Sequence, residues 1–193
     1  MVRLVFLGPP GAGKGTQASL VADLYQVPHI STGDILRINV KQESPLGIQA
    51  KEYMDKGDLV PDQLILDMVQ KRLENSDAQN GWILDGFPRT VTQAQEFVKK
   101  LLSGSSSENE TESNSFQVIN IEVPDDVLIA RLLSRGRQDD NEETIKNRLQ
   151  VYYQQTQPLI EFYQARQQLV TVDGNQSVDV VTNSLKEAID KLI

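Results

Sequence analysis

The fold of this chain is decided by the stretch Gly8-Pro9-Pro10-Gly11-Ala12-Gly13-Lys14-Gly15-Thr16. The stretch follows a run that predicts a strand and precedes a segment that predicts a helix, which is the context that a phosphate-binding loop requires. Glycines let the backbone curl so that several N–H groups converge on one anion, and the N-terminus of the helix adds to the attraction. Lys14 would then reach the β- and γ-phosphates of a nucleotide. Gly15 stands where the general motif has Ser or Thr, and Thr16 comes one position later.

Strand-like and helix-like segments alternate along the rest of the chain. Short apolar or β-branched runs predict five strands, at Arg3–Leu7, Val27–Ser31, Trp82–Asp85, Val118–Val123 and Leu169–Val172. Helical spacing predicts helices at Thr16–Tyr25, Gly33–Val40, Leu46–Lys56, Pro61–Glu74, Thr90–Leu102, Asp126–Arg135, Glu142–Arg166 and Val178–Leu192. The alternation predicts an α/β fold: a doubly wound, parallel, five-stranded sheet with its ligand site at the carboxyl ends of the strands.

The pattern also divides the chain into a core and two insertions. The predicted core with the phosphate loop comprises residues 1–30, 61–134 and 142–193. Residues 31–60 carry helices alone and predict a small flap, and residues 135–141 predict a short lid, because lids in phosphotransferases are often such insertions. Residues 103–115 are acidic and lack apolar side chains, which predicts a flexible loop within the core.

The composition limits the partners. The chain has 193 residues, a formal net charge of −8 and no cysteine. The negative charge argues against binding of a nucleic-acid polymer or a membrane surface, and the lack of cysteine excludes disulfides and cysteine-ligated zinc. No apolar run approaches the ~18 residues of a membrane-spanning helix. The lack of cysteine fits a reducing compartment, so we expect a cytoplasmic protein. An acidic protein that handles polyphosphate must gather its cations in one cleft, so the positions of the arginines matter.

Four blocks of sequence resemble the nucleoside monophosphate kinase family, and they follow one another in that family's order over nearly the whole chain. The blocks are residues 8–17, the phosphate loop, in which Gly15 is the family's usual residue; Ser31-Thr32-Gly33-Asp34 with Arg37, the start of the monophosphate-binding flap; Asp85-Gly86-Phe87-Pro88-Arg89-Thr90 with Gln93, the central signature; and Arg131, Arg135, Arg137, Asp139, Asp140 and Arg148, the lid and the helix after it.

Within that family the chain resembles the adenylate kinases with a short lid, which implies reversible phosphoryl transfer from MgATP to AMP to give two ADP. The resemblance implies Mg²⁺ as cofactor, no zinc, the small-molecule partners ATP, AMP and ADP, and a monomer. It places the ATP site at Gly11, Ala12, Gly13, Lys14, Gly15, Thr16, Arg131, Arg135 and Gly174. It places the AMP site at Thr32, Arg37, Met54, Asp58, Val60, Gly86, Arg89, Gln93, Arg137 and Arg148. The implied catalytic residues are Lys14, Arg89, Arg131, Arg135, Arg137 and Arg148, and Asp85 would contact Mg²⁺ through bound water.

Phosphoryl transfer explains why such a site consists mainly of cations. Two polyanions must approach within bonding distance, and the transferring group passes through a loose transition state with spread negative charge. Catalysis then depends on positioning and positive charge and needs no strong general base.

Residues at three positions indicate which nucleotide accepts the phosphoryl group. Thr32, Thr90 and Gln93 resemble the adenylate kinase pattern, and an amide can pair with the adenine edge through two hydrogen bonds. A UMP/CMP kinase of the same family is the alternative, although such enzymes typically carry Ala and Asn in place of Thr32 and Thr90. A different class, a P-loop switch module that hydrolyses nucleotide slowly, is the second alternative. The sequence has no Asn-Lys-x-Asp guanine motif, and a switch would not need the second set of arginines.

Two further features have more than one interpretation. Asp139 and Asp140 either orient the lid or cap the following helix, because Asp140 and Glu143 have the spacing of a capping box. His29, the single histidine, is interpreted as structural rather than catalytic.

Overall fold

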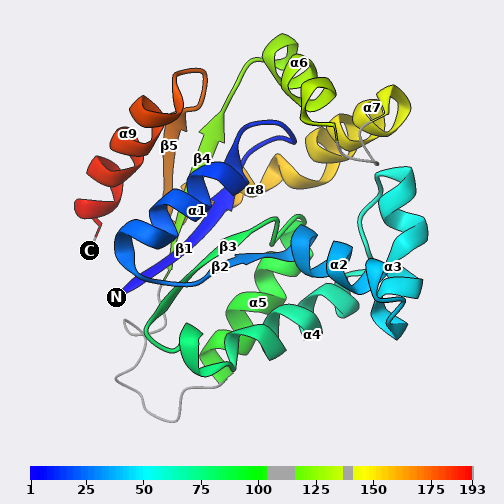
Figure 1. Ribbon diagram of the computed structural model, residues 1–193. Coiled ribbons are helices and arrows are strands. Elements are labelled where there is room, and N and C mark those ends of the chain that lie inside the picture. Colours follow the sequence, from blue (N-terminus) through cyan, green and yellow to red (C-terminus); the bar gives the residue numbers. More distant parts are fainter. Residues whose placement is uncertain (104–115, 137–140, 193) are drawn as a thin grey trace.

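A computed structural model describes residues 1–103, 116–136 and 141–192 of the chain (Figure 1). Its sheet consists of β1 (Val2–Leu7), β2 (His29–Ser31), β3 (Gly81–Asp85), β4 (Gln117–Glu122) and β5 (Leu169–Asp173). The strands lie in the order β2-β3-β1-β4-β5, and every pair of neighbours is parallel. The predicted α/β class and the five-stranded parallel sheet are therefore confirmed.

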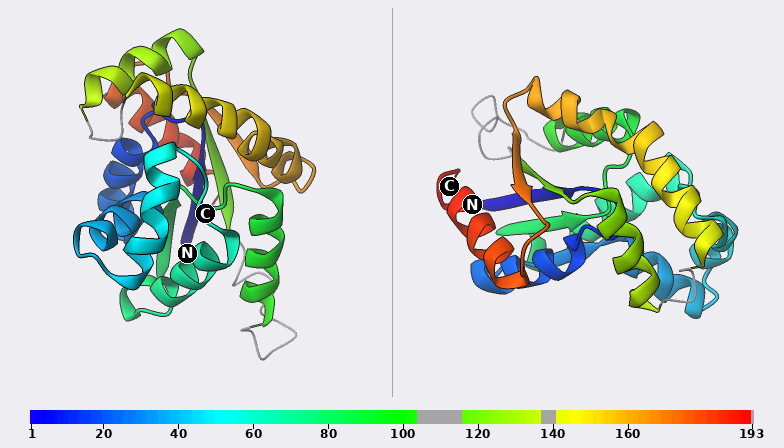
Figure 2. Two further views of the ribbon diagram at one scale, coloured as in Figure 1. Left: turned by 90° about the vertical axis from the view of Figure 1, so that its right-hand side faces the viewer. Right: turned by 90° about the horizontal axis from the view of Figure 1, so that it is seen from above.

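Helices cover both faces of the sheet (Figure 2). They are α1 (Lys14–Tyr25), α2 (Thr32–Lys41), α3 (Pro45–Lys56), α4 (Asp62–Leu73), α5 (Val91–Ser103), α6 (Asp125–Arg135), α7 (Glu142–Val151), α8 (Pro158–Gln164) and α9 (Val178–Asp190), with a 3₁₀ turn at Ser76–Ala78 and a π-helical turn at Tyr152–Thr156. Ser31 ends β2, and after it the regular elements up to residue 60 are helices alone, as expected. The predicted flexible loop lies outside the described residues except for Ser103, which ends α5.

Alternation along β1 builds two apolar layers. Leu4 and Phe6 point to the side where α1 and α9 pack, and Val5 and Leu7 point to the side of α4, α5 and α8. Since side chains alternate along a strand, a central strand with both faces covered must be apolar throughout. None of the helices in the described part of the chain is long and apolar enough to cross a membrane.

The predicted single helix over residues 142–166 is wrong. The helix α7 ends at Val151, and a wider turn precedes α8. Pro158 has no N–H to donate, and its ring would collide with the carbonyl one turn earlier, so the regular hydrogen-bond ladder cannot continue through it. The N–H of Gln157 instead reaches the carbonyl of Tyr152 at 2.8 Å, five residues back.

The cap of α7 also differs from the capping-box interpretation. The N-cap is Asn141, whose side chain accepts the N–H of Thr144 at 2.9 Å. Asp139 and Asp140 lie outside the described residues.

Tyr163 offers a test of the core. Its side chain is 0% exposed and contacts the rings of Phe116 and Phe162, yet its hydroxyl has no hydrogen-bond partner among the described residues. Because a buried hydroxyl without a partner destabilises the fold, we expect Tyr163→Phe to raise the free energy of unfolding by about 1 kcal/mol. Thermal unfolding should show a melting temperature about 2–4 °C higher.

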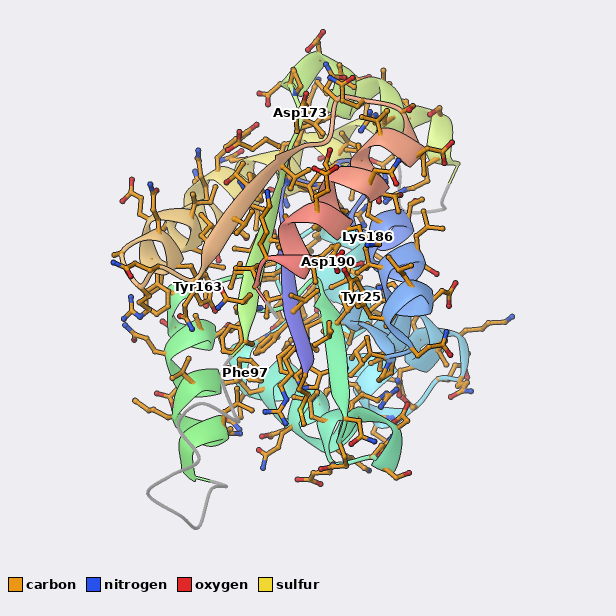
Figure 3. The ribbon with its side chains drawn as sticks, turned by 90° about the vertical axis from the view of Figure 1, so that its left-hand side faces the viewer. Tyr25, Phe97, Tyr163, Asp173, Lys186 and Asp190 are labelled. Carbon is orange, nitrogen blue, oxygen red and sulfur yellow. The ribbon has the colours of Figure 1, made fainter. Side chains whose placement is uncertain are left out.

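Tyr25→Phe is the matched control for Tyr163→Phe. The Tyr25 hydroxyl donates to Asp190 at 2.5 Å between α1 and α9, where Figure 3 shows both residues beside Lys186. Loss of the Tyr25 hydroxyl removes a hydrogen bond and should not raise the melting temperature. A lower melting temperature for Tyr163→Phe than for the unmodified protein would contradict the assignment of an unsatisfied hydroxyl.

Candidate active site

The phosphate loop joins the carboxyl end of β1 to α1. Gly13, the N-cap of α1, has φ = +90°, a left-handed conformation that favours glycine. No described side chain caps this helix, and its first turn has no acidic residue, whereas α2, α3, α7 and α9 each have a Ser or Asn cap. The N–H groups and the positive end of the α1 dipole therefore remain available for an anion.

Lys14 closes over this loop. Its ammonium donates to the carbonyls of Gly8 at 2.8 Å and Pro9 at 2.9 Å. Burial lowers the pKa of Lys14 to about 8; the Asp85 carboxylate raises it, and the charges of Arg89 and Arg135 lower it. The side chain is thus held where several cations and one carboxylate meet.

A cleft of about 740 Å³ opens at the carboxyl ends of the strands. It collects predicted site residues from the loop, the flap, the central signature and the helices that flank the lid. Those that line it are Gly11, Gly13, Lys14, Gly15, Thr16, Thr32, Arg37, Met54, Asp58, Val60, Asp85, Gly86, Arg89, Gln93, Arg131, Arg135 and Arg148. Arg137 lies outside the described residues. All the other predicted site residues line either this cleft or the adjoining pocket.

The adjoining pocket, of about 240 Å³, contains the two remaining predicted residues, Ala12 and Gly174. Arg131 spans it and donates from both terminal nitrogens to the Gly174 carbonyl, at 3.1 Å each. Gln17, to which the sequence analysis assigns no role, also lines this pocket. Gln17 is buried, donates to the Val178 carbonyl at 3.0 Å and accepts from the Thr182 hydroxyl at 2.8 Å, so it ties α1 to α9.

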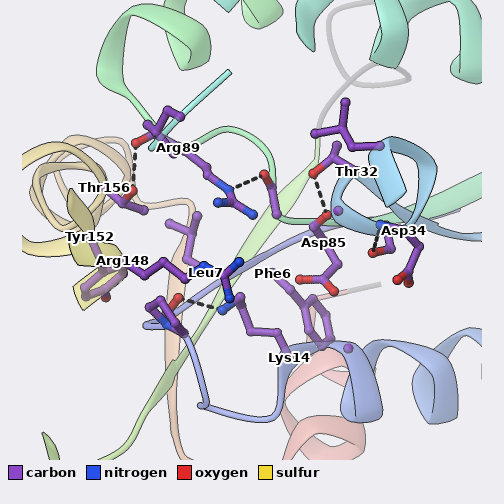
Figure 4. Close-up of a pocket in the computed structure, with 18 of the residues that line it drawn as sticks. Phe6, Leu7, Lys14, Thr32, Asp34, Asp85, Arg89, Arg148, Tyr152 and Thr156 are labelled. Atoms are coloured by element: carbon purple, nitrogen blue, oxygen red, sulfur yellow. Dashed lines mark hydrogen bonds between the residues drawn. The ribbon is translucent and has the colours of Figure 1, made fainter. Parts of the chain in front are cut away.

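Cations from separate elements face one another in the larger cleft. Figure 4 shows Lys14, Arg89 and Arg148 directed toward one space. The Arg89 side chain is reached by solvent but lies between the walls of the cleft. The pKa of Arg89 is lowered, mainly because these walls displace water from the guanidinium. The Asp85 carboxylate raises this pKa, and the charges of Arg148 and Arg37 lower it further. Such mutual repulsion is unfavourable in a site without an anion, so the cluster is suited to bind a polyanion.

Arg89 is held from two sides. Its Nε donates to the Gly86 carbonyl at 2.8 Å, and its own carbonyl accepts the Thr156 hydroxyl at 2.8 Å. Thr156 lies in the π-helical turn, 67 residues away in sequence, and nothing in the local pattern pointed to it. Through this contact, the π-helical turn between α7 and α8 binds the backbone of Arg89 in the cleft.

Gln93 is 1% exposed, and both ends of its amide are engaged. Its carbonyl accepts the N–H of Arg89 at 2.7 Å, and its Nε2 donates to Asp62 at 2.7 Å. Each end retains one further hydrogen-bonding position, because an amide carries two donor hydrogens and two lone pairs. The role of Gln93 in reading adenine stays a prediction, and Asp62, which orients it, was missed.

Asp85 ends β3 opposite the phosphate loop. Its side chain is 13% exposed, and a Cβ on Gly15 would lie 3.4 Å from its Oδ2. Burial raises the pKa of Asp85, but His29, whose Nε2 lies 3.6 Å away, together with Lys14 and Arg89 lowers it by more, so the net pKa is below its usual value. The lowered pKa indicates a charged carboxylate, and the structural role of His29 stays a prediction.

The donor set around Asp85 fits Mg²⁺ carried by a nucleotide. Within the described residues, no cluster of three or more His, Cys, Asp or Glu side chains could hold a metal by itself. Mg²⁺ commonly uses one or two carboxylates, several waters and the phosphates of the substrate, so a single charged carboxylate beside a phosphate loop matches that chemistry.

Comparison with known proteins agrees with this geometry. The family model described as adenylate kinase matches residues 6–168. A protein of Trichodesmium erythraeum (strain IMS101) named adenylate kinase is 74% identical over 192 residues, which cover 100% of both chains. Adenylate kinase 1 of Nostoc sp. (strain PCC 7120) is 54% identical over 98% of this chain and 99% of its own. An adenylate kinase of Corynebacterium urealyticum is 50% identical over 98% of this chain and 100% of its own. Since the family model matches residues 6–168 and these relatives are at least 50% identical over at least 98% of the chain, the chain belongs to the adenylate kinase family.

Proposed function

We propose that this chain catalyses reversible phosphoryl transfer from MgATP to AMP, giving two ADP. One observation carries the proposal: a single cleft runs from the phosphate loop to the flap and is lined by Lys14, Arg37, Arg89 and Arg148. One nucleotide needs only one set of phosphate ligands. Cations on both sides of the cleft match two phosphate chains that meet end to end.

In the proposed complex the donor triphosphate lies at the N-terminus of α1, and its base lies in the pocket of Ala12, Gly174 and Arg131. Lys14 would exchange its bonds to the Gly8 and Pro9 carbonyls for the β- and γ-phosphates. Arg89 and Arg37 would hold the phosphate of AMP. Arg131, Arg135, Arg137 and Arg148 would neutralise the charge that spreads over the transferring group.

Asp85 would hold Mg²⁺ through bound water, and the ion would neutralise the donor phosphates. What this chain's own residues supply is orientation. Asp85 ends β3 beside the start of α1, with His29 Nε2 3.6 Å from its Oδ2, and the Thr32 hydroxyl donates to the Asp85 carbonyl at 3.2 Å.

The division into a core, a flap at residues 31–60 and a lid at residues 135–141 stays a prediction. It is supported by the helices α2 and α3, which lie beside the sheet (Figure 1), and by the helix α6, which carries Arg131 and leads into the lid segment at Arg135. A lid must close, because open water would otherwise accept the phosphoryl group. We also infer a monomer, since closure requires that no second subunit covers the flap and the lid, and we keep the expectation of a cytoplasmic protein.

An acceptor screen tests the proposal. With MgATP as donor and AMP, CMP, UMP and GMP as acceptors, we expect kcat/KM for AMP to exceed the others by at least about 100-fold, because a site that hydrogen-bonds one base leaves polar groups unpaired with another. ADP formation is followed by a coupled assay. Preference for UMP or CMP would transfer the assignment to the pyrimidine enzymes of the family.

A bisubstrate mimic, two adenosines joined through a phosphate chain, separates an enzyme from a switch module. A two-nucleotide site should bind the mimic much more tightly than ATP or AMP alone. A one-site switch would bind only one half, with no gain over ATP.

A further inference from the structure

The end of α3 is fastened to α7 by hydrogen bonds between segments about 90 residues apart. The Asn147 Nδ2 donates to the Lys56 carbonyl at 2.7 Å and to the Asp58 carboxylate at 2.8 Å. One turn earlier on α7, the buried Thr144 hydroxyl donates to the Asp55 carbonyl at 3.2 Å. Figures 1 and 2 show α7 lying against α3 in each view. The amide has two hydrogens, so both acceptors of Asn147 are served at once.

The backbone between these acceptors is shaped to fit α7. Gly57 caps α3 with φ = +80°, and a Cβ at this residue would lie 3.0 Å from both the Thr144 carbonyl and the Cγ of Arg148. A glycine here permits both the left-handed turn and the close approach. The contact is therefore built into two distant pieces of sequence and does not result from a chance meeting of surface side chains.

This contact adjoins the wall of the cleft where the acceptor is proposed to bind. Met54, Gly57, Asp58 and Val60 line the cleft from the α3 side, and Arg148 lines it from α7. Arg148 follows Asn147 directly in the sequence and lies close enough to Arg89 for its charge to lower the Arg89 pKa. A contact that fixes residues 55–58 against α7 therefore also fixes the distance from the α3 side of the cleft to Arg148 and Arg89.

We propose that Asn147 is a positioning residue for the acceptor nucleotide, which holds residues 55–58 in register with Arg148. Asn147 acts through its neighbours and has no role in the chemistry itself. The inference rests on the proposed function, because it assigns the α3 side of the cleft to AMP. Without the amide, the acceptor would itself have to order this wall, and its apparent affinity would equal the intrinsic affinity multiplied by the fraction of molecules in which the wall is already in place.

The decisive experiment compares steady-state kinetics of Asn147→Leu, which has a similar size but no donors, with those of the unmodified protein. We expect the KM for AMP to rise about 5- to 20-fold and the KM for ATP to change less than twofold. Asn147→Asp should have at least as large an effect, since a carboxylate would face the Lys56 carbonyl and the Asp58 carboxylate. Direct binding of AMP measured by calorimetry should weaken by a similar factor.

Lys146→Leu is the matched control. Lys146 precedes Asn147 on α7, is exposed and pairs with Glu142 on its own helix, so its loss should leave both KM values unchanged. A merely structural role of Asn147 would lower the melting temperature and raise both KM values alike; that result, or an unchanged KM for AMP in both Asn147 variants, overturns the inference. If the unmodified protein fails to phosphorylate AMP, the proposed function fails instead, so the two failures are distinguishable.

Discussion

Replacement of Lys14 by Met should lower kcat/KM for ATP about 1,000-fold, the largest effect expected from any single substitution in this chain. Lys14 lies at the start of α1, where the loop directs its ammonium toward the carbonyls of Gly8 and Pro9. Met has a similar length and no charge, so the variant removes the cation without leaving a cavity. Steady-state kinetics with both nucleotides varied are the measurement.

The control for Lys14 is Lys99→Met, which removes an exposed ammonium on α5 that pairs only with Glu96 among the described residues. That variant should keep the kinetics of the unmodified protein. Activity of Lys14→Met within tenfold of the unmodified protein, with an unchanged circular dichroism spectrum, would contradict the role of the loop lysine.

The pKa of Lys14 adds a pH dependence to this prediction. Burial lowers that pKa to about 8 in the nucleotide-free protein, and only the protonated ammonium attracts phosphates. Since kcat/KM reports groups of the free enzyme, kcat/KM for ATP should fall as the pH rises through about 8. Lys14→Met should lack this decline. A flat profile to pH 9.5 in the unmodified protein would argue against titration of Lys14 in this range.

Replacement of Arg89 by Ala should lower kcat/KM for AMP by about 100- to 1,000-fold, equivalent to roughly 3–4 kcal/mol of transition-state stabilisation. Arg89 lies among Arg37, Arg148 and Asp85. Its Nε donates to the Gly86 carbonyl, and Thr156 holds its backbone carbonyl. Arg89→Lys keeps the charge but loses the planar fork, so we expect an intermediate loss. The effect should appear in both the KM for AMP and kcat.

Arg72→Ala is the control for Arg89, because Arg72 forms a bidentate pair with Asp77 beside α4, away from the cleft. It should change stability slightly and leave the kinetics intact. Normal AMP kinetics in Arg89→Ala, with the fold preserved, would remove Arg89 from the proposed acceptor site.

The prediction from sequence was most accurate where the determinants are local. The phosphate loop and the alternation of strands and helices depend on spacing within about ten residues, and the structure confirms the fold class they imply. The ends were less accurate: α1 begins at Lys14 and not at Thr16, because Gly13 already supplies the left-handed cap. The continuous helix predicted over residues 142–166 is wrong because Pro158 has no N–H to donate, so a π-helical turn separates α7 from α8.

The sequence by itself determined the chemistry of this protein. The phosphate loop, the Asp-Gly-Phe-Pro-Arg block and the spaced arginines specify what the cleft can bind, since charge and hydrogen-bonding capacity belong to residue types. Only the tertiary structure decided what holds those groups in place. Three hydrogen bonds do this between residues 31, 67 and 91 positions apart: those of Gln93 with Asp62, of Thr156 with Arg89 and of Asn147 with Lys56. No local pattern records such pairs, because their donors and acceptors meet only after the sheet and its helices have packed.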